Sequence, residues 1–137
     1  MDTPRLCLDT RLLITYLRGR EPGASATLRA VRDYSCSVSA ITVYELLFGL
    51  ARAQKSIGEA DLLSLMSALP FDEAAARRTA TLHHELLSNG LDIGIKDTMI
   101  AATALEHNLP LLTLNERHFV RVPSLQVISV EQFLAPY

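Results

Sequence analysis

Short apolar segments that alternate with helix-like segments constrain the fold of this chain more than any other feature. We predict strands at residues 5–9, 34–38, 111–114 and 125–128, and helices at 10–18, 22–31, 39–54, 59–69, 73–88 and 95–107. Strands that alternate with helices favour a parallel sheet, because each connection must cross the sheet before the next strand begins. The sequence therefore predicts an α/β fold with helices on both faces of the sheet, in one domain that spans residues 1–137.

Composition supports a packed core and excludes a generally basic nucleic-acid clamp. Hydrophobic residues make up 49% of the chain and charged residues 20%, which argues against disorder. The formal charge of −2 means that contact with a polyanion needs a local basic patch or a bound metal. The sequence has neither a Walker loop nor a Gly-x-Gly-x-x-Gly loop, which argues against nucleotide-driven chemistry.

The start of the chain and its cysteines indicate the compartment. No signal peptide precedes the first predicted strand, and no apolar run approaches the ~20 residues that span a bilayer. We therefore expect a cytoplasmic protein without a membrane segment. Cys7 and Cys36 lie in apolar or small-residue runs and are expected to be buried free thiols. The lack of paired Cys/His spacings argues against structural zinc.

Three acidic residues in apolar surroundings form the candidate site. Asp9 ends the first predicted strand, Glu45 lies in the helix after the second, and Asp97 opens the helix before the third. Burying a carboxylate is costly without a compensating partner, and three of them could share one divalent cation. Sites in open parallel sheets lie beyond the carboxyl ends of the strands. These acids, and Asn115 after the third strand, can therefore reach one end of the sheet.

Each acid also has a purely local explanation. Asp9 could cap the helix that begins at Thr10. Thr42 and Glu45 match the capping-box pattern, and Asp97 could interact with the dipole of its helix. Capping does not explain the apolar sequence on both sides of Glu45, since an exposed first turn would carry more polar neighbours.

The remaining acids and histidines that we considered receive no functional role at this stage. Asp92 and Glu116 are interpreted as solvated loop acids. His83 and His84 lie within a predicted helix, His107 lies near a helix end, and His118 is placed in a loop. No nearby Ser, Cys or acid stands at a spacing that suggests a catalytic triad.

Four segments carry a resemblance to a known family. They are Leu8-Asp9-Thr10 before an apolar helix, residues 39–49 (SAITVYELLFG), residues 93–104 (IGIKDTMIAATA), and residues 112–115 (LTLN) with Phe119 shortly after. With these segments in this order, the chain resembles the PIN-domain nucleases. It is most similar to the toxin subunits of type II toxin–antitoxin pairs of the VapBC kind. The resemblance covers nearly the whole chain.

The resemblance implies a PIN-like three-layer α/β/α sandwich with a central parallel sheet of four or five strands. It also implies an endoribonuclease that depends on Mg²⁺, for which Mn²⁺ can substitute. Asp9, Glu45 and Asp97 match the three acidic positions of the family, Asn115 matches its fourth position, and Thr10 matches the hydroxyl residue beside the first acid. We assign these five residues to catalysis, with Asp9 and Asp97 holding the metal and Glu45 binding it directly or through a water.

Two positions depart from the family pattern. Arg11 stands where a small polar residue is more usual, and brings a positive charge to the rim of the site. Asn115 replaces the more common acid, which weakens the case for a second metal, although Glu116 could partly substitute. These departures leave open a catalytically weak PIN-like module that binds RNA or protein. A receiver-type signalling domain is disfavoured, because Asp9 stands alone after its strand.

Substrate and partners follow from the same resemblance. Single-stranded or looped RNA is the expected substrate, since its phosphates are accessible. A cognate antitoxin and a homodimer are implied, and the apolar helices near residues 44–69 are compatible with a groove for an amphipathic partner, a dimer interface or plain core packing. Six basic side chains could rim the site or be ordinary surface charges: Arg11, Arg18, Arg20, Lys96, Arg117 and Arg121.

Overall fold

The computed structural model describes residues 3–136. The strands are β1 (Arg5–Leu8), β2 (Ser35–Ser39), β3 (Ser67–Leu69), β4 (Leu111–Thr113) and β5 (Val127–Ser129). The helices are α1 (Thr10–Leu17), α2 (Gly23–Asp33), α3 (Ala40–Ala53), α4 (Glu59–Ser64), α5 (Glu73–Ser88), α6 (Ile95–Glu106), α7 (Glu116–Phe119) and α8 (Val130–Leu134).

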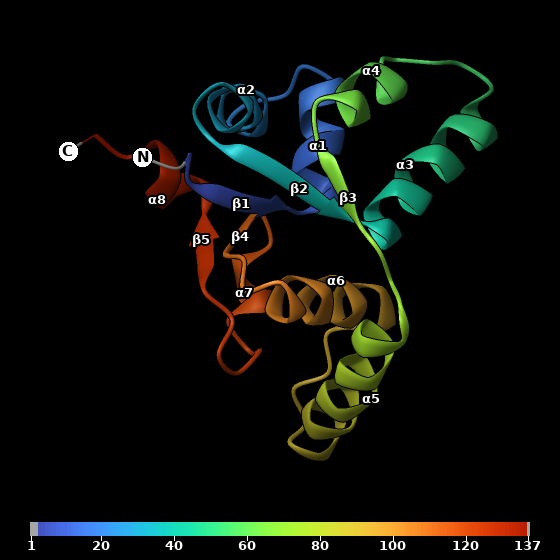
Figure 1. The fold of residues 1–137 in the computed structure, drawn as a ribbon. Coiled ribbons are helices and arrows are strands. Elements are labelled where there is room, and N and C mark those ends of the chain that lie inside the picture. The colour runs from blue at the N-terminus through green and yellow to red at the C-terminus, as the bar shows by residue number, and fades with distance from the viewer. Residues whose placement is uncertain (1–2, 137) are drawn as a thin grey trace.

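The five strands form one parallel sheet in the order β3-β2-β1-β4-β5 (Figure 1). β1 pairs with β2 on one side and with β4 on the other. The chain adds β2 and β3 on one side of β1 and then β4 and β5 on the other, so the strand order switches direction between β1 and β4. Open parallel sheets bind ligands beyond the carboxyl ends of the strands at such a switch point. The predicted α/β class is confirmed, and the five strands agree with the four or five that the resemblance implies, one more than the four predicted from the sequence patterns.

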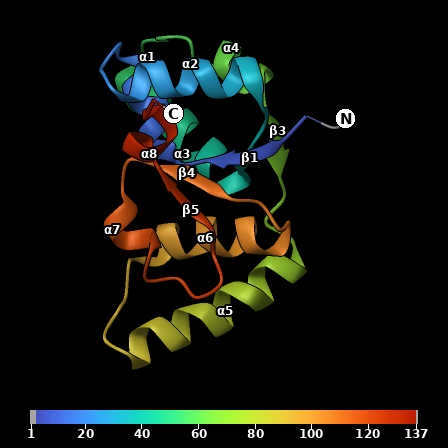
Figure 2. The ribbon, with the colours of Figure 1, turned by 90° about the vertical axis from the view of Figure 1, so that its left-hand side faces the viewer.

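Helices cover both faces of this sheet, and alternate strand residues supply the two cores (Figure 2). Leu6 and Leu8 of β1 belong to the core on the side of α1, α2 and α8. Cys7, between them, belongs to the core on the side of α6. α6 contributes a buried small-residue face, and α5 packs mainly on α6. This alternation is expected for strands buried on both faces.

Helix α3 leaves the carboxyl end of β2 and contacts both α1 and α6. Its first turn is capped by Ser39, whose Oγ accepts a hydrogen bond of 3.1 Å from the backbone N–H of Thr42. Thr42 is therefore not the capping residue, and the capping-box explanation of Glu45 is wrong. α3 instead carries Glu45 to the start of α1, where its carboxylate accepts a hydrogen bond from Thr10.

The single helix predicted at residues 59–69 is also wrong. α4 ends at Ser64, where the Ser64 hydroxyl donates to the backbone carbonyl of Asp61 at 2.6 Å. Ser67–Leu69 then form β3, which pairs with β2 over three residues. Hydrogen bonds to β2 thus override the local helical pattern. A short apolar segment by itself is compatible with either a helix or a strand.

Smaller differences lie at element ends and near the C-terminus. The last predicted strand, at residues 125–128, is found at Val127–Ser129, and α7 and α8 were not predicted. Cys7 and Cys36 are free and buried, as expected, and lie in opposite cores. Among the described helices, none has both the length and the apolar composition needed to cross a membrane.

Candidate active site

Asp9 occupies the junction between β1 and α1 and is almost completely buried, with 3% of its surface exposed. It stands at the N-cap position of α1, yet its side chain makes no capping hydrogen bond. Its Oδ2 instead accepts a hydrogen bond of 2.8 Å from the hydroxyl of Thr113, the last residue of β4. The carboxylate therefore lies at the switch point of the sheet, and capping does not account for its burial.

Burial raises the pKa of Asp9 from 3.8 to about 6, because desolvation penalises the charged form. The nearby charge of Asp97 raises this pKa further, while the Thr113 hydrogen bond and the charge of Arg11 lower it. Asp9 and Asp97 are thus close enough to repel each other electrostatically. A cation between them would relieve both penalties on Asp9.

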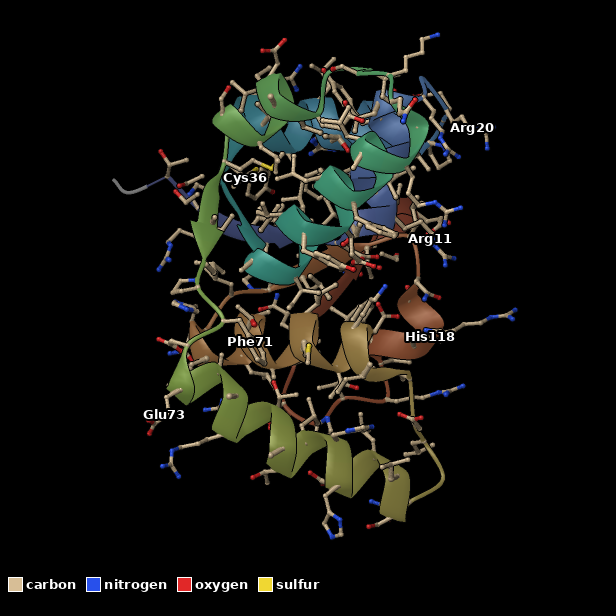
Figure 3. The ribbon with its side chains drawn as sticks, turned by 90° about the vertical axis from the view of Figure 1, so that its right-hand side faces the viewer. Arg11, Arg20, Cys36, Phe71, Glu73 and His118 are labelled. Atoms are coloured by element: carbon tan, nitrogen blue, oxygen red, sulfur yellow. The ribbon has the colours of Figure 1, made fainter. Side chains whose placement is uncertain are left out.

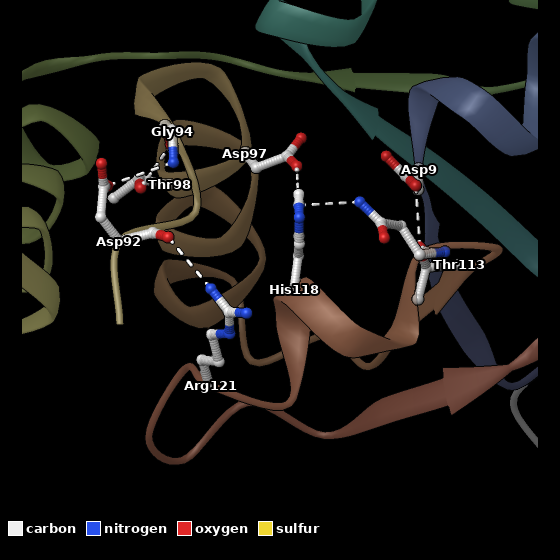
Figure 4. Close-up of polar contacts among 9 residues, drawn as sticks. Asp9, Asp92, Gly94, Asp97, Thr98, Thr113, His118 and Arg121 are labelled. Carbon is white, nitrogen blue, oxygen red and sulfur yellow. Dashed lines mark hydrogen bonds and ion pairs between the residues drawn. The ribbon is translucent and has the colours of Figure 1, made fainter. Parts of the chain in front are cut away.

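Asp97 lies in the first turn of α6 and points toward the same region (Figure 4). Its Oδ2 is 3.1 Å from Nδ1 of His118, on α7. The same Nδ1 is 2.8 Å from the side-chain amide of Asn115, at the N-cap of α7. The backbone N–H of Asn115 donates to the Thr113 hydroxyl at 2.8 Å. Polar contacts therefore connect Asp97 to Asp9 through three residues.

Glu45 joins the site through the first residue of α1. The hydroxyl of Thr10 donates to Oε1 of Glu45 at 2.8 Å and lies 2.8 Å from the hydroxyl of Thr42. Thr10 follows Asp9 directly in the chain, so α1 positions both residues at once. The five residues predicted for the site thus lie in two hydrogen-bonded groups that meet at Asp9 and Thr10.

The donor set suits a hard cation, because carboxylates and waters are the ligands that Mg²⁺ prefers. Within residues 3–136, no three Asp, Glu, His or Cys side chains converge closely enough to hold one ion by themselves. Mg²⁺ normally keeps several waters and needs only one or two carboxylates. Asp9 and Asp97 with waters therefore fit the ion, and direct ligation by all three acids stays a prediction.

Two residues of the site were missed by sequence reasoning. Thr113 was quoted only within a motif, and His118 was placed in a loop without a role, whereas it lies in the short helix α7. The signal was the spacing of Asn115 and His118, because residues three apart share one face of a helix. A helix of four residues leaves too little periodicity for this face to be recognised.

Basic residues are unevenly placed around the acids. Arg11 of α1 and His118 of α7 lie on the same edge of the molecule in Figure 3. Lys96 precedes Asp97 and lies 5.8 Å from the ring centroid of Tyr44 on α3. Arg121 points elsewhere and donates to the backbone carbonyl of Asp92 at 3.1 Å (Figure 4). Along the chain, Arg11 lies two residues after Asp9 and Lys96 lies directly before Asp97, so these two cations are the nearest to the acids in sequence.

Comparison with known proteins shows the family of the chain. The family model described as the PIN domain matches residues 6–125. The chain is 32% identical to "Ribonuclease VapC" of Rickettsia bellii over 91% of this chain and 96% of that protein. It is 29% identical to the "tRNA(fMet)-specific endonuclease VapC" of Shigella flexneri over 89% of this chain and 95% of that protein.

A solved structure extends the likeness to three dimensions. The structure of VapBC-1 from nontypeable Haemophilus influenzae matches with a TM-score of 0.76 and 26% identity, over 92% of this chain and 98% of that chain. The chain belongs to the PIN domain family, and within it to the VapC ribonucleases.

Proposed function

We propose that this protein is a metal-dependent endoribonuclease and the toxin of a toxin–antitoxin pair. The observation that supports it most is the buried carboxylate of Asp9, which faces the charge of Asp97 at the switch point of the sheet. A purely structural role would leave the free-energy cost of burying this carboxylate uncompensated, whereas a cation bound between the two acids would offset it.

In this proposal some residues of the site hold the ion and others orient the substrate. Asp9 and Asp97 would hold Mg²⁺ or Mn²⁺, with Glu45 reaching it directly or through a water. The bound ion would neutralise charge on the scissile phosphate and lower the pKa of a coordinated water. Thr10 fixes the Glu45 carboxylate. The side of the Asn115 amide that does not contact His118 would orient a water or a phosphate oxygen.

Cleavage of RNA by purified protein tests this assignment. Asp9→Asn and Asp97→Asn should abolish cleavage in Mg²⁺ or Mn²⁺ without loss of secondary structure by circular dichroism. Asp33→Asn, at an exposed acid paired with Arg32, is the matched control and should cleave normally. Wild-type activity in EDTA, or full activity in either site variant, would contradict the proposal. Binding of RNA without cleavage by the wild type would favour the binding-module alternative.

Transfer RNA is the substrate to test first, because the Shigella relative is named for tRNA(fMet). The expected result is a small number of defined fragments, since single-stranded loops of a folded RNA expose their phosphates. Uniform degradation of all RNAs would contradict a tRNA-specific substrate but not the nuclease itself.

Two adjoining clefts form the surface that we propose for an antitoxin. One, of about 650 Å³, lies among α1, α2 and α4 and exposes Leu28 and Leu65. The other runs along α1 and α3 and reaches Glu45. Both are lined by Leu17 and Ile57. We propose that an amphipathic antitoxin segment lies in the first cleft and continues along the second toward the acids.

Variants on the two sides of the molecule test the antitoxin surface. Leu65→Glu should weaken binding of the antitoxin encoded by the neighbouring gene, because it places a charge in the apolar cleft. Leu87→Glu, at a similarly exposed leucine of α5, should leave that binding unchanged. Equal affinities of the two variants, measured by calorimetry, would exclude this surface.

A homodimer is proposed through the exposed side of α3. Tyr44, Leu47 and Phe48 are all exposed there, and the rings of Tyr44 and Phe48 stack with centroids 5.7 Å apart. Apolar patches of this kind on an otherwise charged surface commonly mark an interface. Sedimentation should show a dimer for the wild type and a monomer for Phe48→Glu. A wild-type monomer at micromolar concentration would contradict it.

A further inference from the structure

His118 makes a contact in the site that the roles assigned above do not use. Its Nδ1 is 3.1 Å from Oδ2 of Asp97 and 2.8 Å from the Asn115 amide. The imidazole is 40% exposed and the Asp97 side chain 28%, so the pair lies at the edge of the site, where solvent enters. α7 holds the imidazole there because Phe119, the next residue, is completely buried.

The chemistry of the three groups fixes the position of the hydrogens. A carboxylate only accepts hydrogen bonds, so an unprotonated Nδ1 facing Asp97 would place two acceptors against each other. Nδ1 must therefore carry a proton and donate to Oδ2 of Asp97. In the structure the Asn115 atom that faces Nδ1 is the amide nitrogen Nδ2. A protonated Nδ1 cannot accept from that N–H, so we infer that the Asn115 amide is turned over, with Oδ1 toward the imidazole. Asn115 then holds the ring in place as a second acceptor.

This arrangement uses one oxygen of Asp97 and leaves the other available. No described residue donates a hydrogen bond to its Oδ1, whereas Oδ2 is occupied by His118. Carboxylates that bind metals are commonly held in this way by a hydrogen bond from a neighbouring group, which fixes the orientation of the free oxygen. An ordinary surface ion pair would need neither the Asn115 contact nor a particular ring nitrogen.

Resting on the metal-dependent function proposed above, we propose that His118 is a positioning residue for the metal. Its Nδ1–H holds Oδ2 of Asp97, so that Oδ1 faces the ion next to Asp9. His118 acts through Asp97 and not on the RNA. The prediction is therefore a loss of metal affinity, with cleavage largely restored when the metal is saturating.

Three substitutions separate the two ring nitrogens. Asparagine places its side-chain amide near the position of Nδ1, glutamine places it near Nε2, and alanine removes both donors. We expect His118→Ala and His118→Gln to weaken Mn²⁺ binding by roughly 10- to 100-fold in calorimetry, and His118→Asn to stay within a few-fold of the wild type. His84→Ala, at an exposed histidine of α5, is the control and should bind as the wild type does.

A second measurement needs no metal at all. In the metal-free protein, ¹⁵N NMR of the imidazole should show His118 protonated at Nδ1, and Asp97→Asn should alter that signal. An unprotonated Nδ1 in the wild type would overturn the inference, as would equal Mn²⁺ affinity of His118→Ala and the wild type. If the wild type binds no Mn²⁺ and cleaves no RNA, the proposed function fails. If it does both while His118→Ala binds normally, only the role of His118 fails.

Discussion

Replacing Asp9 by Asn should stabilise the metal-free protein at neutral pH while it removes the central acid of the site. Asn is the same size, and its Oδ1 can still accept the hydrogen bond from Thr113. What disappears is a charge that is desolvated and faces Asp97. The substitution therefore isolates the energetic cost of keeping this carboxylate ionised.

The size of the effect follows from the pKa of Asp9, which rises from 3.8 to about 6 on folding. Between these values the native state binds a proton that the unfolded state has released, so the free energy of unfolding falls as the pH rises. Above about pH 6 the whole cost is present. At about 1.4 kcal/mol for each pKa unit, the rise of roughly two units corresponds to about 3 kcal/mol. At pH 4 the cost is less than about 1 kcal/mol.

Urea unfolding in EDTA at pH 7.5 and pH 4 measures this difference. Asp9→Asn should gain about 3 kcal/mol at pH 7.5, roughly 10 °C in Tm for a chain of this size, and little at pH 4. Asp33→Asn is the control and should gain nothing at pH 7.5, because Arg32 lowers the pKa of the exposed Asp33. Equal gains of Asp9→Asn at both pH values would refute the argument, since they could not come from ionisation.

Further predictions concern packing and metal binding. Gly23→Ala should destabilise by roughly 1–3 kcal/mol in urea unfolding, because the new Cβ would clash with Oγ1 of Thr15. Gly49→Ala, in open space on α3, should instead gain roughly 0.5–1 kcal/mol from helix propensity, and a loss there would contradict that reasoning. Thr27→Val should gain about 1 kcal/mol, because the buried hydroxyl has no hydrogen-bond partner among the described residues. Mg²⁺ should raise the Tm of the wild type by mass action and raise that of Asp97→Asn less, and equal shifts would count against a shared site.

The sequence predicted the parts of the fold that depend on strong local patterns. β1 and α1 are adjacent and clearly patterned, so the position of Asp9 at their junction was predictable. The motif around Asp97 likewise placed it in the first turn of a long helix. The location of both acids at one edge of the sheet then follows from the order of strands and helices, because the carboxyl ends of parallel strands meet at that edge.

What the sequence could not provide depends on contacts between distant residues. β3 forms only because Ser67–Leu69 align with β2, and nothing within those three residues distinguishes them from the end of a helix. The cap of α3 was misassigned because Ser39 and Thr42 both suit a capping position. Only the turn of the chain out of β2 selects Ser39. The position of His118 in the site could not be predicted, because it depends on α7, a helix of four residues that is too short to show a helical pattern.

The acids of the candidate site have different partners from the acids that form ion pairs with Arg. Where Arg bonds an acid in residues 3–136, the acid is Asp33, Glu73 or Glu106, all away from the site. Asp9 and Glu45 are held instead by the neutral hydroxyls of Thr113 and Thr10. Hydroxyl donors fix the positions of the carboxylates without cancelling their charge. Acids buried only for stability would be paired with cations, because an unpaired buried charge is costly. The chain thus keeps a fixed negative charge at the switch point, which is the condition a divalent cation requires.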